Sequence, residues 1–177
     1  MTKPRGPVFE RVPEGDDRPR LTCADCGFIH YVNPRVVVGA VAHWDGHVLL
    51  ARRAIEPRKG YWTIPAGFLE VGETLEAGAV RETWEEARAR AAAQHLIGVY
   101  NIARIGQIYM VFRARLLSGD HAPGPESLET ALVTWDDVPW DDLAFPSVRW
   151  ALQHDRENAA GTALPPRFEP PAIHWER

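Results

Sequence analysis

The stretch Gly67-Phe-Leu-Glu-Val-Gly-Glu73-Thr-Leu-Glu-Ala-Gly-Ala-Val-Arg81-Glu82-Thr-Trp-Glu85-Glu86 decides the fold of this chain. It predicts a helix from about Leu75 to Ala92. Thr74 is a good N-cap, and Glu76 places a carboxylate in the first turn, where the helix dipole stabilises it. At about 100° per residue, one side of this helix is expected to bury against a sheet. That side carries Ala79, Val80, Thr83, Trp84 and Ala87.

Three glutamates share another face of the same helix. Glu82, Glu85 and Glu86 lie within an arc of about 100°, and ionised carboxylates at this spacing repel one another at a cost in helix stability. A divalent cation would offset that cost, and carboxylate oxygens suit Mg²⁺ or Mn²⁺. The three glutamates alone leave a solvated acidic face, with Arg81 paired to Glu85, as the alternative. Gly78 lies on this face too, and a glycine in a helix interior costs about 1 kcal/mol relative to alanine, which hints that space is needed there.

Strand-like segments flank the helix on both sides in the sequence. The β-branched run Val36–Val41 and the run His47–Arg52 are separated by Asp45-Gly46, a tight-turn signal that predicts a hairpin. Further strands are expected at Leu96–Ile105, Gln107–Leu117 and Ala131–Trp135, and a second helix at Ser147–Asn158. This mixture predicts an α/β fold in which the first helix packs on a mixed sheet.

The two ends of the chain differ in composition from its middle. Residues 1–20 are rich in Pro, Gly, Arg and Asp and show no periodicity, so a short arm or loop is expected there. Residues 161–177 are rich in proline and are not expected to form a helix. We therefore expect an N-terminal arm at 1–34, a single domain at 35–160 and a proline-rich tail at 161–177.

Composition excludes several classes of protein. The 177 residues contain 20 Lys and Arg against 24 Asp and Glu, and the formal charge of -4 argues against nucleic acid bound through its phosphates. The absence of an apolar run of about 18 residues argues against a membrane span. The N-terminus lacks the apolar stretch of a signal peptide, and two cysteines cannot build a disulfide scaffold. A reduced, cytoplasmic protein is expected.

The spacing within the deciding stretch resembles the signature of the Nudix hydrolases, a family of pyrophosphatases. Gly67 is followed after five residues by Glu73, and after seven more by Arg81-Glu82-x-x-Glu85-Glu86. The resemblance implies a Nudix α/β/α sandwich with a mixed β-sheet and a catalytic loop and helix. Three positions depart from the pattern, namely Thr83, Arg88 and Ala89. Because Arg88 replaces a small turn residue, we expect the helix to run on toward Ala91–Ala93.

The resemblance also implies roles for single residues. Glu82, Glu85 and Glu86 would ligate the divalent metal ions together with the backbone carbonyl of Ala66, and Glu73 would pair with Arg81. The physical logic is that a metal ion must neutralise a pyrophosphate and acidify the attacking water before a carboxylate takes the proton. Glu86 could be this general base, and so could Glu126 or Glu129. For Glu126 and Glu129, plain loop solubility is an equally good reading.

Segments outside the motif narrow the range of substrates that the resemblance implies. Ile55-Glu-Pro57, Trp62–Glu70 and Trp140–Pro146 agree with the subgroup of ADP-ribose and FAD pyrophosphatases. ADP-ribose is therefore the first expected substrate, followed by FAD and NADH, with AMP released. Homodimers are frequent among the family's ADP-ribose hydrolases, and a homodimer is expected on that ground. A silent nucleotide-binding regulatory module is the main alternative; the net charge argues against an RNA cap hydrolase.

Charged and aromatic residues before the motif are candidates for binding this small-molecule nucleotide. Arg52 and Arg53 could hold the phosphates, while Tyr61 or Phe68 could stack on the base. The alternative reading is an arginine-rich loop in solvent.

The segment Arg18–Pro34 resembles the zinc-binding leader of the same subgroup. That leader holds two Cys-x-x-Cys pairs, whereas this chain has only Cys23 and Cys26. A structural Zn²⁺ ion requires four ligands. His30 could be a third ligand, and a second chain could supply another pair, but a segment without Zn²⁺ is the simpler expectation.

Overall fold

The computed structural model describes residues 6–158 and 165–168. The chain forms two compact units, Met1–Pro34 and Arg35–Arg177. Most of the tail predicted at 161–177 lies outside the described residues. Among the described residues, no helix is long and apolar enough to cross a membrane.

The larger unit begins with the predicted hairpin. Strand β4 (Arg35–Trp44) turns at Asp45-Gly46 into β5 (His47–Arg53), and the strands pair antiparallel with His43 opposite Val48. Asp45 and Gly46 have positive φ angles of 44° and 77°. Two consecutive positive φ values are what a two-residue hairpin turn requires, which explains the Asp-Gly sequence.

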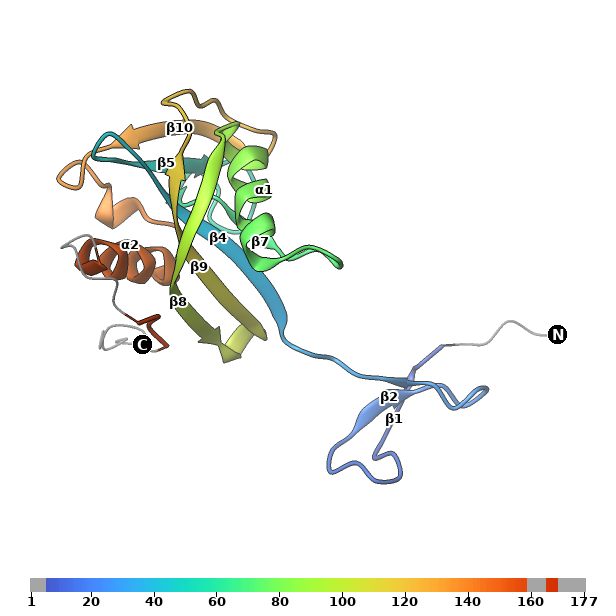
Figure 1. The fold of residues 1–177 in the computed structure, drawn as a ribbon. Coiled ribbons are helices and arrows are strands. Elements are labelled where there is room, and N and C mark those ends of the chain that lie inside the picture. Colours follow the sequence, from blue (N-terminus) through green and yellow to red (C-terminus); the bar gives the residue numbers. More distant parts are fainter. Residues whose placement is uncertain (1–5, 159–164, 169–177) are drawn as a thin grey trace. The chain divides into compact units, whose positions relative to one another are not determined.

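Seven strands form one mixed sheet (Figure 1). The order is β10 (Ser127–Val133), β5, β4, β9 (Gln107–Leu116) and β8 (Ala91–Ile102). Strands β4 and β9 run parallel, and the other pairs in this order run antiparallel. Two short strands complete the sheet: β6 (Trp62–Thr63) pairs with β5, and β7 (Ala66–Phe68) pairs with β4.

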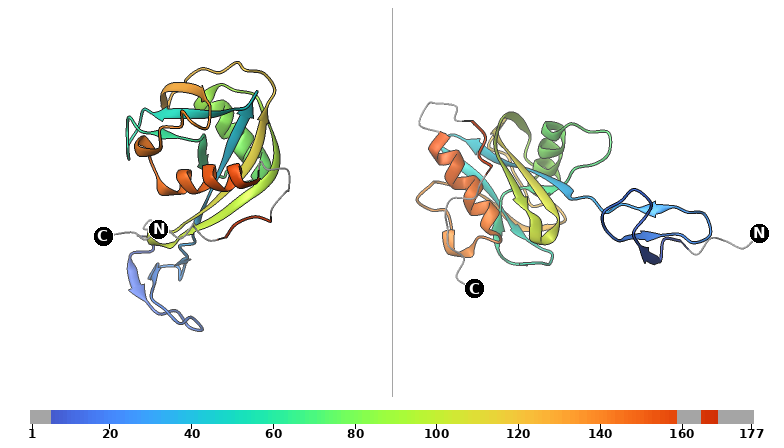
Figure 2. Two further views of the ribbon diagram at one scale, coloured as in Figure 1. Left: turned by 90° about the vertical axis from the view of Figure 1, so that its left-hand side faces the viewer. Right: turned by 90° about the horizontal axis from the view of Figure 1, so that it is seen from below.

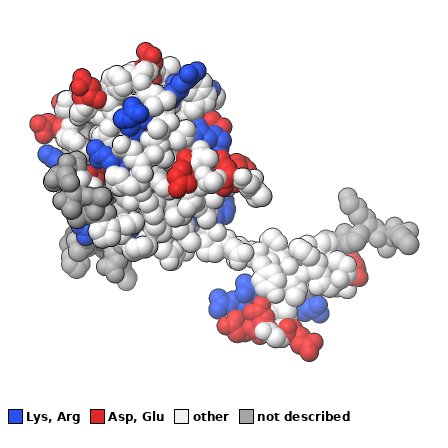
Figure 3. Space-filling view, viewed as in Figure 1, with Lys and Arg blue, Asp and Glu red and all other residues white. Residues whose placement is uncertain are grey.

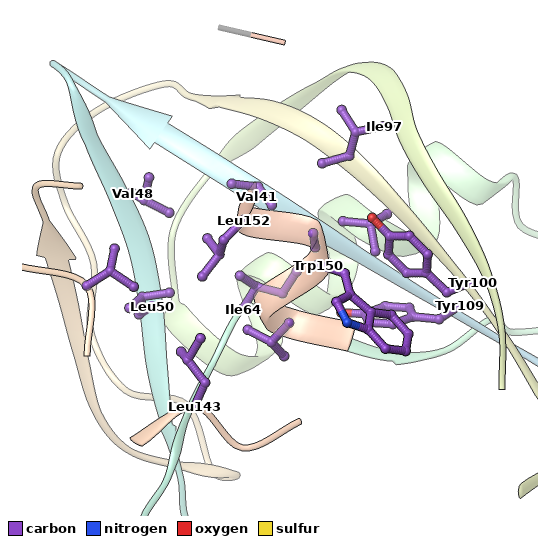
Figure 4. Close-up of a cluster of buried hydrophobic side chains, with 14 residues drawn as sticks. Val41, Val48, Leu50, Ile64, Ile97, Tyr100, Tyr109, Leu143, Trp150 and Leu152 are labelled. Atoms are coloured by element: carbon purple, nitrogen blue, oxygen red, sulfur yellow. The ribbon is translucent and has the colours of Figure 1, made fainter. Parts of the chain in front are cut away.

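Two helices cover opposite faces of this sheet (Figure 2). Alternate residues of β4 belong to different hydrophobic clusters. Val41 packs on the side of α2 (Pro146–Asn158), and Ala40 packs on the side of α1 (Leu75–Ala87). The cluster beneath α2 contains large side chains such as Tyr100, Tyr109 and Trp150 (Figure 4). The predicted α/β/α arrangement is confirmed. Single 3₁₀ turns occur at Ala103–Ile105 and Trp140–Asp142.

The outer edge of β8 is covered by a piece of the C-terminal segment. The backbone N–H of Arg167 donates to the carbonyl of Ile97 at 3.1 Å, and the N–H of Val99 donates to the carbonyl of Arg167 at 2.8 Å. Gly98 and Arg167 thus form an isolated parallel bridge. Residue 167 adds one rung to the edge of the sheet.

Two expectations about α1 are wrong. The helix ends at Ala87 rather than near Ala92, because Arg88 adopts the left-handed conformation (φ 49°) and its N–H donates to the carbonyl of Trp84. This is the geometry in which a helix usually ends on glycine. Trp84, expected in the core, is exposed, and the guanidinium groups of Arg88 and Arg90 lie 5.7 and 6.0 Å from its ring centroid.

The smaller unit contains three short strands: β1 (Phe9–Arg11), β2 (Arg20–Thr22) and β3 (Ile29–His30). The expectation of an irregular arm at residues 1–20 is therefore wrong for β1. The Arg20 guanidinium pairs with Asp16 at 3.1 Å and lies 5.1 Å from the ring centroid of Tyr31. These contacts stabilise a unit that is too small to bury a large core.

Candidate active site

Arg81 joins the loop before α1 to the carboxylates on that helix. Its Nη2 and Nε donate to the two carboxylate oxygens of Glu73 at 2.8 and 3.1 Å. Its Nη1 donates to Glu82 at 2.6 Å and to Glu85 at 2.9 Å, and Nη2 also donates to the carbonyl of Phe68 at 2.9 Å. Both expected partners of Arg81, Glu73 and Glu85, are hydrogen-bonded to it, and Glu82 is a third partner that was not expected.

The loop is held by Glu73 as well as by Arg81. The Glu73 carboxylate accepts the N–H of Glu70 at 2.8 Å, and the paired Arg81 lowers the pKa of Glu73 to about 2. Gly78 explains how the loop comes so close to the helix. A Cβ at Gly78 would lie 2.8 Å from Glu73 Oε1 and 2.8 Å from Val38 Cγ2, so the space predicted to be needed there is filled by these two side chains.

Glu82 and Glu86 turn inward toward strand β7 and are buried, whereas Glu85 is half exposed. The backbone N–H of Ala66 donates to Glu86 Oε2 at 3.3 Å. A Cβ at Gly67 would lie 2.4 Å from Glu82 Oε1, so this carboxylate lies directly against the strand backbone. Only glycine permits that approach.

Burial changes the acidity of both inward carboxyl groups. The pKa of Glu86 is raised to about 8, mainly by loss of water and in smaller part by the charge of Glu82. Desolvation also raises the pKa of Glu82, although Arg81 opposes the shift. Ionising both buried acids side by side would be costly. A nearby cation would lower that cost by stabilising their charged forms.

The residues present fit a hard divalent cation. Glu82, Glu85, Glu86 and the carbonyl of Ala66 offer only oxygen donors, which Mg²⁺ and Mn²⁺ prefer. The described residues contain no group of three His, Cys, Asp or Glu side chains already arranged to hold a metal ion. At the helix, Arg81 forms ion pairs with Glu82 and Glu85.

Glu126 and Glu129, the two candidate general bases outside the helix, lie in different surroundings. Glu126 is exposed, and its charge contributes to raising the pKa of both Glu82 and Glu86. Glu129 pairs instead with Arg52 at 3.5 Å. A register shift between Ser127 and Glu129 separates the two positions.

The candidate substrate-binding residues each contact different partners. Arg53 is close enough for its charge to act on Glu86, and its Nε donates to the carbonyl of Pro57 at 2.9 Å. The Arg58 guanidinium lies 4.0 Å from the ring centroid of Tyr61, and that of Arg35 lies 4.7 Å from the ring centroid of Phe68. Phe68 is 45% exposed.

The cysteines lie in the smaller unit. Cys23 is buried and Cys26 is exposed, and both are free thiols. Hydrogen bonds from the backbone of Cys26 and Asp25 lower the pKa of Cys23. Within the described part of the chain, His30 and the acidic side chains do not join them in a metal-binding group. Two thiols alone do not make the closed four-ligand site of a structural Zn²⁺ ion.

Comparison with known proteins agrees with this geometry. The NUDIX domain family matches residues 33–152, and the Nudix N-terminal family, a zinc-ribbon type, matches residues 6–32. The chain belongs to the Nudix family. The resemblance predicted from the motif spacing is thereby confirmed.

Individual relatives of this Nudix chain are known in sequence and structure. A crystal structure of a NUDIX hydrolase from Nitrosomonas europaea is 45% identical, has a TM-score of 0.85, and is covered over 93% of its length and 92% of this chain. A MutT-like protein of Streptomyces ambofaciens is 38% identical over 102 residues, which span 58% of this chain and 64% of that protein. An ADP-ribose pyrophosphatase of Methanocaldococcus jannaschii is 33% identical over 119 residues, 65% of this chain and 69% of that protein.

Sequence reasoning missed several features of the Nudix site. It did not anticipate that Glu82 and Glu86 would be buried, nor that the loop before β10 would meet the end of α1. The glycines at 67 and 124 were the available signals, because both lie where a Cβ would clash. On the face of the larger unit shown in Figure 3, Lys and Arg are interspersed with Asp and Glu.

Proposed function

We propose that this Nudix protein hydrolyses the pyrophosphate bond of a nucleoside diphosphate linked to another group, with a divalent metal ion. ADP-ribose is the first expected substrate, then FAD and NADH, and AMP is the expected product. The observation that carries the proposal is the pair of buried carboxyl groups, Glu82 and Glu86, beside the half-exposed Glu85. The ADP-ribose pyrophosphatase among the relatives supports the choice of substrate.

Different residues of the chain would have different roles in the reaction. Glu82, Glu85, Glu86 and the carbonyl of Ala66 would hold Mg²⁺ or Mn²⁺. When bound, the ion would neutralise the diphosphate and lower the pKa of water. Arg81 and Glu73 would hold the loop against the helix so that Gly67 and Ala66 stay in place. This arrangement is supported by the five hydrogen bonds that Arg81 donates.

A carboxylate would remove the proton from the attacking water. Glu86 and Glu126 are the better candidates, since Glu86 is buried in the site and the charge of Glu126 acts on it, while the ion pair with Arg52 engages Glu129. Arg53 would face the phosphates, and Phe68 or Tyr61 would stack on the base. The general base has to be within hydrogen-bond reach of the water, directly or through one further water.

Product analysis tests the proposal. The folded protein is incubated with ADP-ribose, FAD, NADH, dinucleoside polyphosphates and nucleoside triphosphates, each with Mg²⁺ and with EDTA. We expect AMP from one of the first three, only when metal is present. If folded protein hydrolyses nothing in this panel yet binds ADP-ribose, the chain is a nucleotide-binding regulatory module instead.

A further inference from the structure

The loop between β9 and β10 caps the C-terminal end of helix α1. The N–H of Gly124 donates to the carbonyl of Glu86 at 2.9 Å, and the N–H of Ala122 donates to the carbonyl of Ala87 at 2.9 Å. The last carbonyls of a helix have no partner within the helix. This loop supplies two partners at the turn that carries Glu85 and Glu86.

Gly124 is buried and lies against the helix backbone with no room for a side chain. A Cβ at this position would lie 1.7 Å from the carbonyl oxygen of Glu85, 2.8 Å from its carbonyl carbon and 3.1 Å from Cα of Glu86. All three are backbone atoms, so no side-chain rotation could relieve the clash. Any other residue at 124 has to move the loop away from the helix.

The same loop carries Glu126 two residues later. The N–H of Ser127 donates to the carbonyl of Gly124 at 3.0 Å, and the N–H of Ala54 donates to the carbonyl of Glu126 at 2.8 Å. The backbone of Glu126 is thus fixed between α1 and the end of β5. This backbone geometry keeps Glu126 next to the last turn of α1, and its charge acts on both Glu82 and Glu86.

We propose that Gly124 is a positioning residue that holds the loop on the last turn of α1 and thereby places Glu126 beside Glu82 and Glu86. The inference rests on the proposed function, because it assigns Glu126 a part in that reaction. Gly124 itself touches no reacting atom and acts through Glu126. A displacement of the loop by about 1 Å can cost on the order of 100-fold in rate.

A double-mutant cycle tests this inference. Gly124→Ala is made in the wild-type protein and in Glu126→Gln, and kcat and KM for the hydrolysed substrate are measured. We expect Gly124→Ala alone to lower kcat by about 10- to 100-fold, with KM within about twofold. In the Glu126→Gln background the same change should cost less than about twofold, because residues that act as a unit are not additive.

Two further variants separate positioning from folding. Gly119→Ala lies in the same loop and places its Cβ 2.8 Å from Nε1 of the partly exposed Trp44 side chain, which can move, so wild-type kcat is expected. Pro125→Gly removes the ring and adds no heavy atom, so it introduces no heavy-atom clash, but it loosens the link between Gly124 and Glu126. It should lower kcat in the wild-type background and not in Glu126→Gln, even if Gly124→Ala fails to fold.

A readout independent of turnover is the backbone amide signal of Glu126 in the presence of Mn²⁺. A nearby paramagnetic ion should broaden this signal in the wild-type protein and less so in Gly124→Ala or Pro125→Gly. Losses that multiply in the double mutants, or wild-type kcat in Glu126→Gln, would overturn the inference and leave the proposed function standing. A folded wild-type protein with no metal-dependent hydrolysis would overturn the proposed function itself.

Discussion

The two faces of the sheet are built from side chains of different size. Beneath α1, the buried cluster is mostly alanine, with Ala40, Ala42, Ala79, Ala87 and Ala114 among its members. Beneath α2, it contains Tyr100, Tyr109, Trp150 and several leucines and valines. Small residues let a helix approach the sheet closely, and large ones bury more apolar area. The difference indicates that the α1 face is shaped to bring Glu82 and Glu86 to the strand backbone, while the α2 face supplies stability.

The largest expected effect is on turnover, at the α1 face. Glu86→Gln should lower kcat by about 100- to 10,000-fold, the range typical of a lost catalytic proton-transfer group. Its melting temperature should be equal or higher, because the amide avoids the cost of burying an acid whose pKa is raised to about 8. Steady-state kinetics and thermal melts check both, with Glu76→Gln on the same helix as the control. Wild-type turnover in Glu86→Gln would contradict the assignment.

On the α2 face the effect should be on stability. Trp150→Ala removes a buried indole that packs edge-on against Tyr100, with ring centroids 5.7 Å apart. The expected loss is about 3–5 kcal/mol in the free energy of unfolding. Urea denaturation measures it, and the exposed Trp84→Ala is the matched control, which should cost far less. Equal losses for the two tryptophans would show that burial does not govern this face.

A matched pair of alanine-to-leucine substitutions compares the two faces of the sheet directly. Ala79→Leu beneath α1 and Ala151→Leu beneath α2 each force a larger side chain into a fully buried site, at about 1–3 kcal/mol. Only Ala79→Leu should also reduce kcat, because it pushes Glu82 and Glu86 away from β7. Denaturation and kinetics are measured on both proteins. A similar fall in kcat for Ala151→Leu would remove the functional distinction.

The smallest expected effect is a pH dependence of stability from α2. Burial lowers the pKa of His154, which accepts or donates a 2.8 Å hydrogen bond with the Tyr100 hydroxyl. Near pH 6.5, His154 therefore binds a proton more readily in the unfolded chain than in the folded protein. The contribution of His154 is present above that pH and is lost as the pH falls toward its folded pKa. The decline in unfolding free energy between pH 7.5 and 5.5 should be smaller in His154→Gln. An unchanged decline would contradict this.

Local chemistry made the start of α1 and the β4–β5 hairpin predictable. Thr74 caps the helix by accepting the N–H of Ala77, and Asp45-Gly46 adopts the positive φ values that its sequence favours. The end of α1 was not predictable in this way. Arg88 has no intrinsic preference for the left-handed conformation. It adopts that conformation where the loop 118–126 caps the helix, a contact between segments far apart in the sequence.

The same limit applies to the candidate site. The spacing of Glu82, Glu85 and Glu86 was visible in the sequence, but which of them would be buried was not. That depends on how closely β7 approaches, and therefore on Gly67. Distinguishing Glu126 from Glu129 required the register shift in β10, a feature of strand pairing that turn and helix signals do not reveal. Periodicity predicts which residues share a face and says little about distances between elements.

The single rung that Arg167 adds to β8 has a consequence for solubility. An open strand edge presents unpaired N–H and C=O groups to which another chain can add. On this edge the groups of Ile97 and Val99 are already bonded to Arg167. The protein thus blocks, with its own backbone, a place where strands of neighbouring molecules could otherwise join into aggregates.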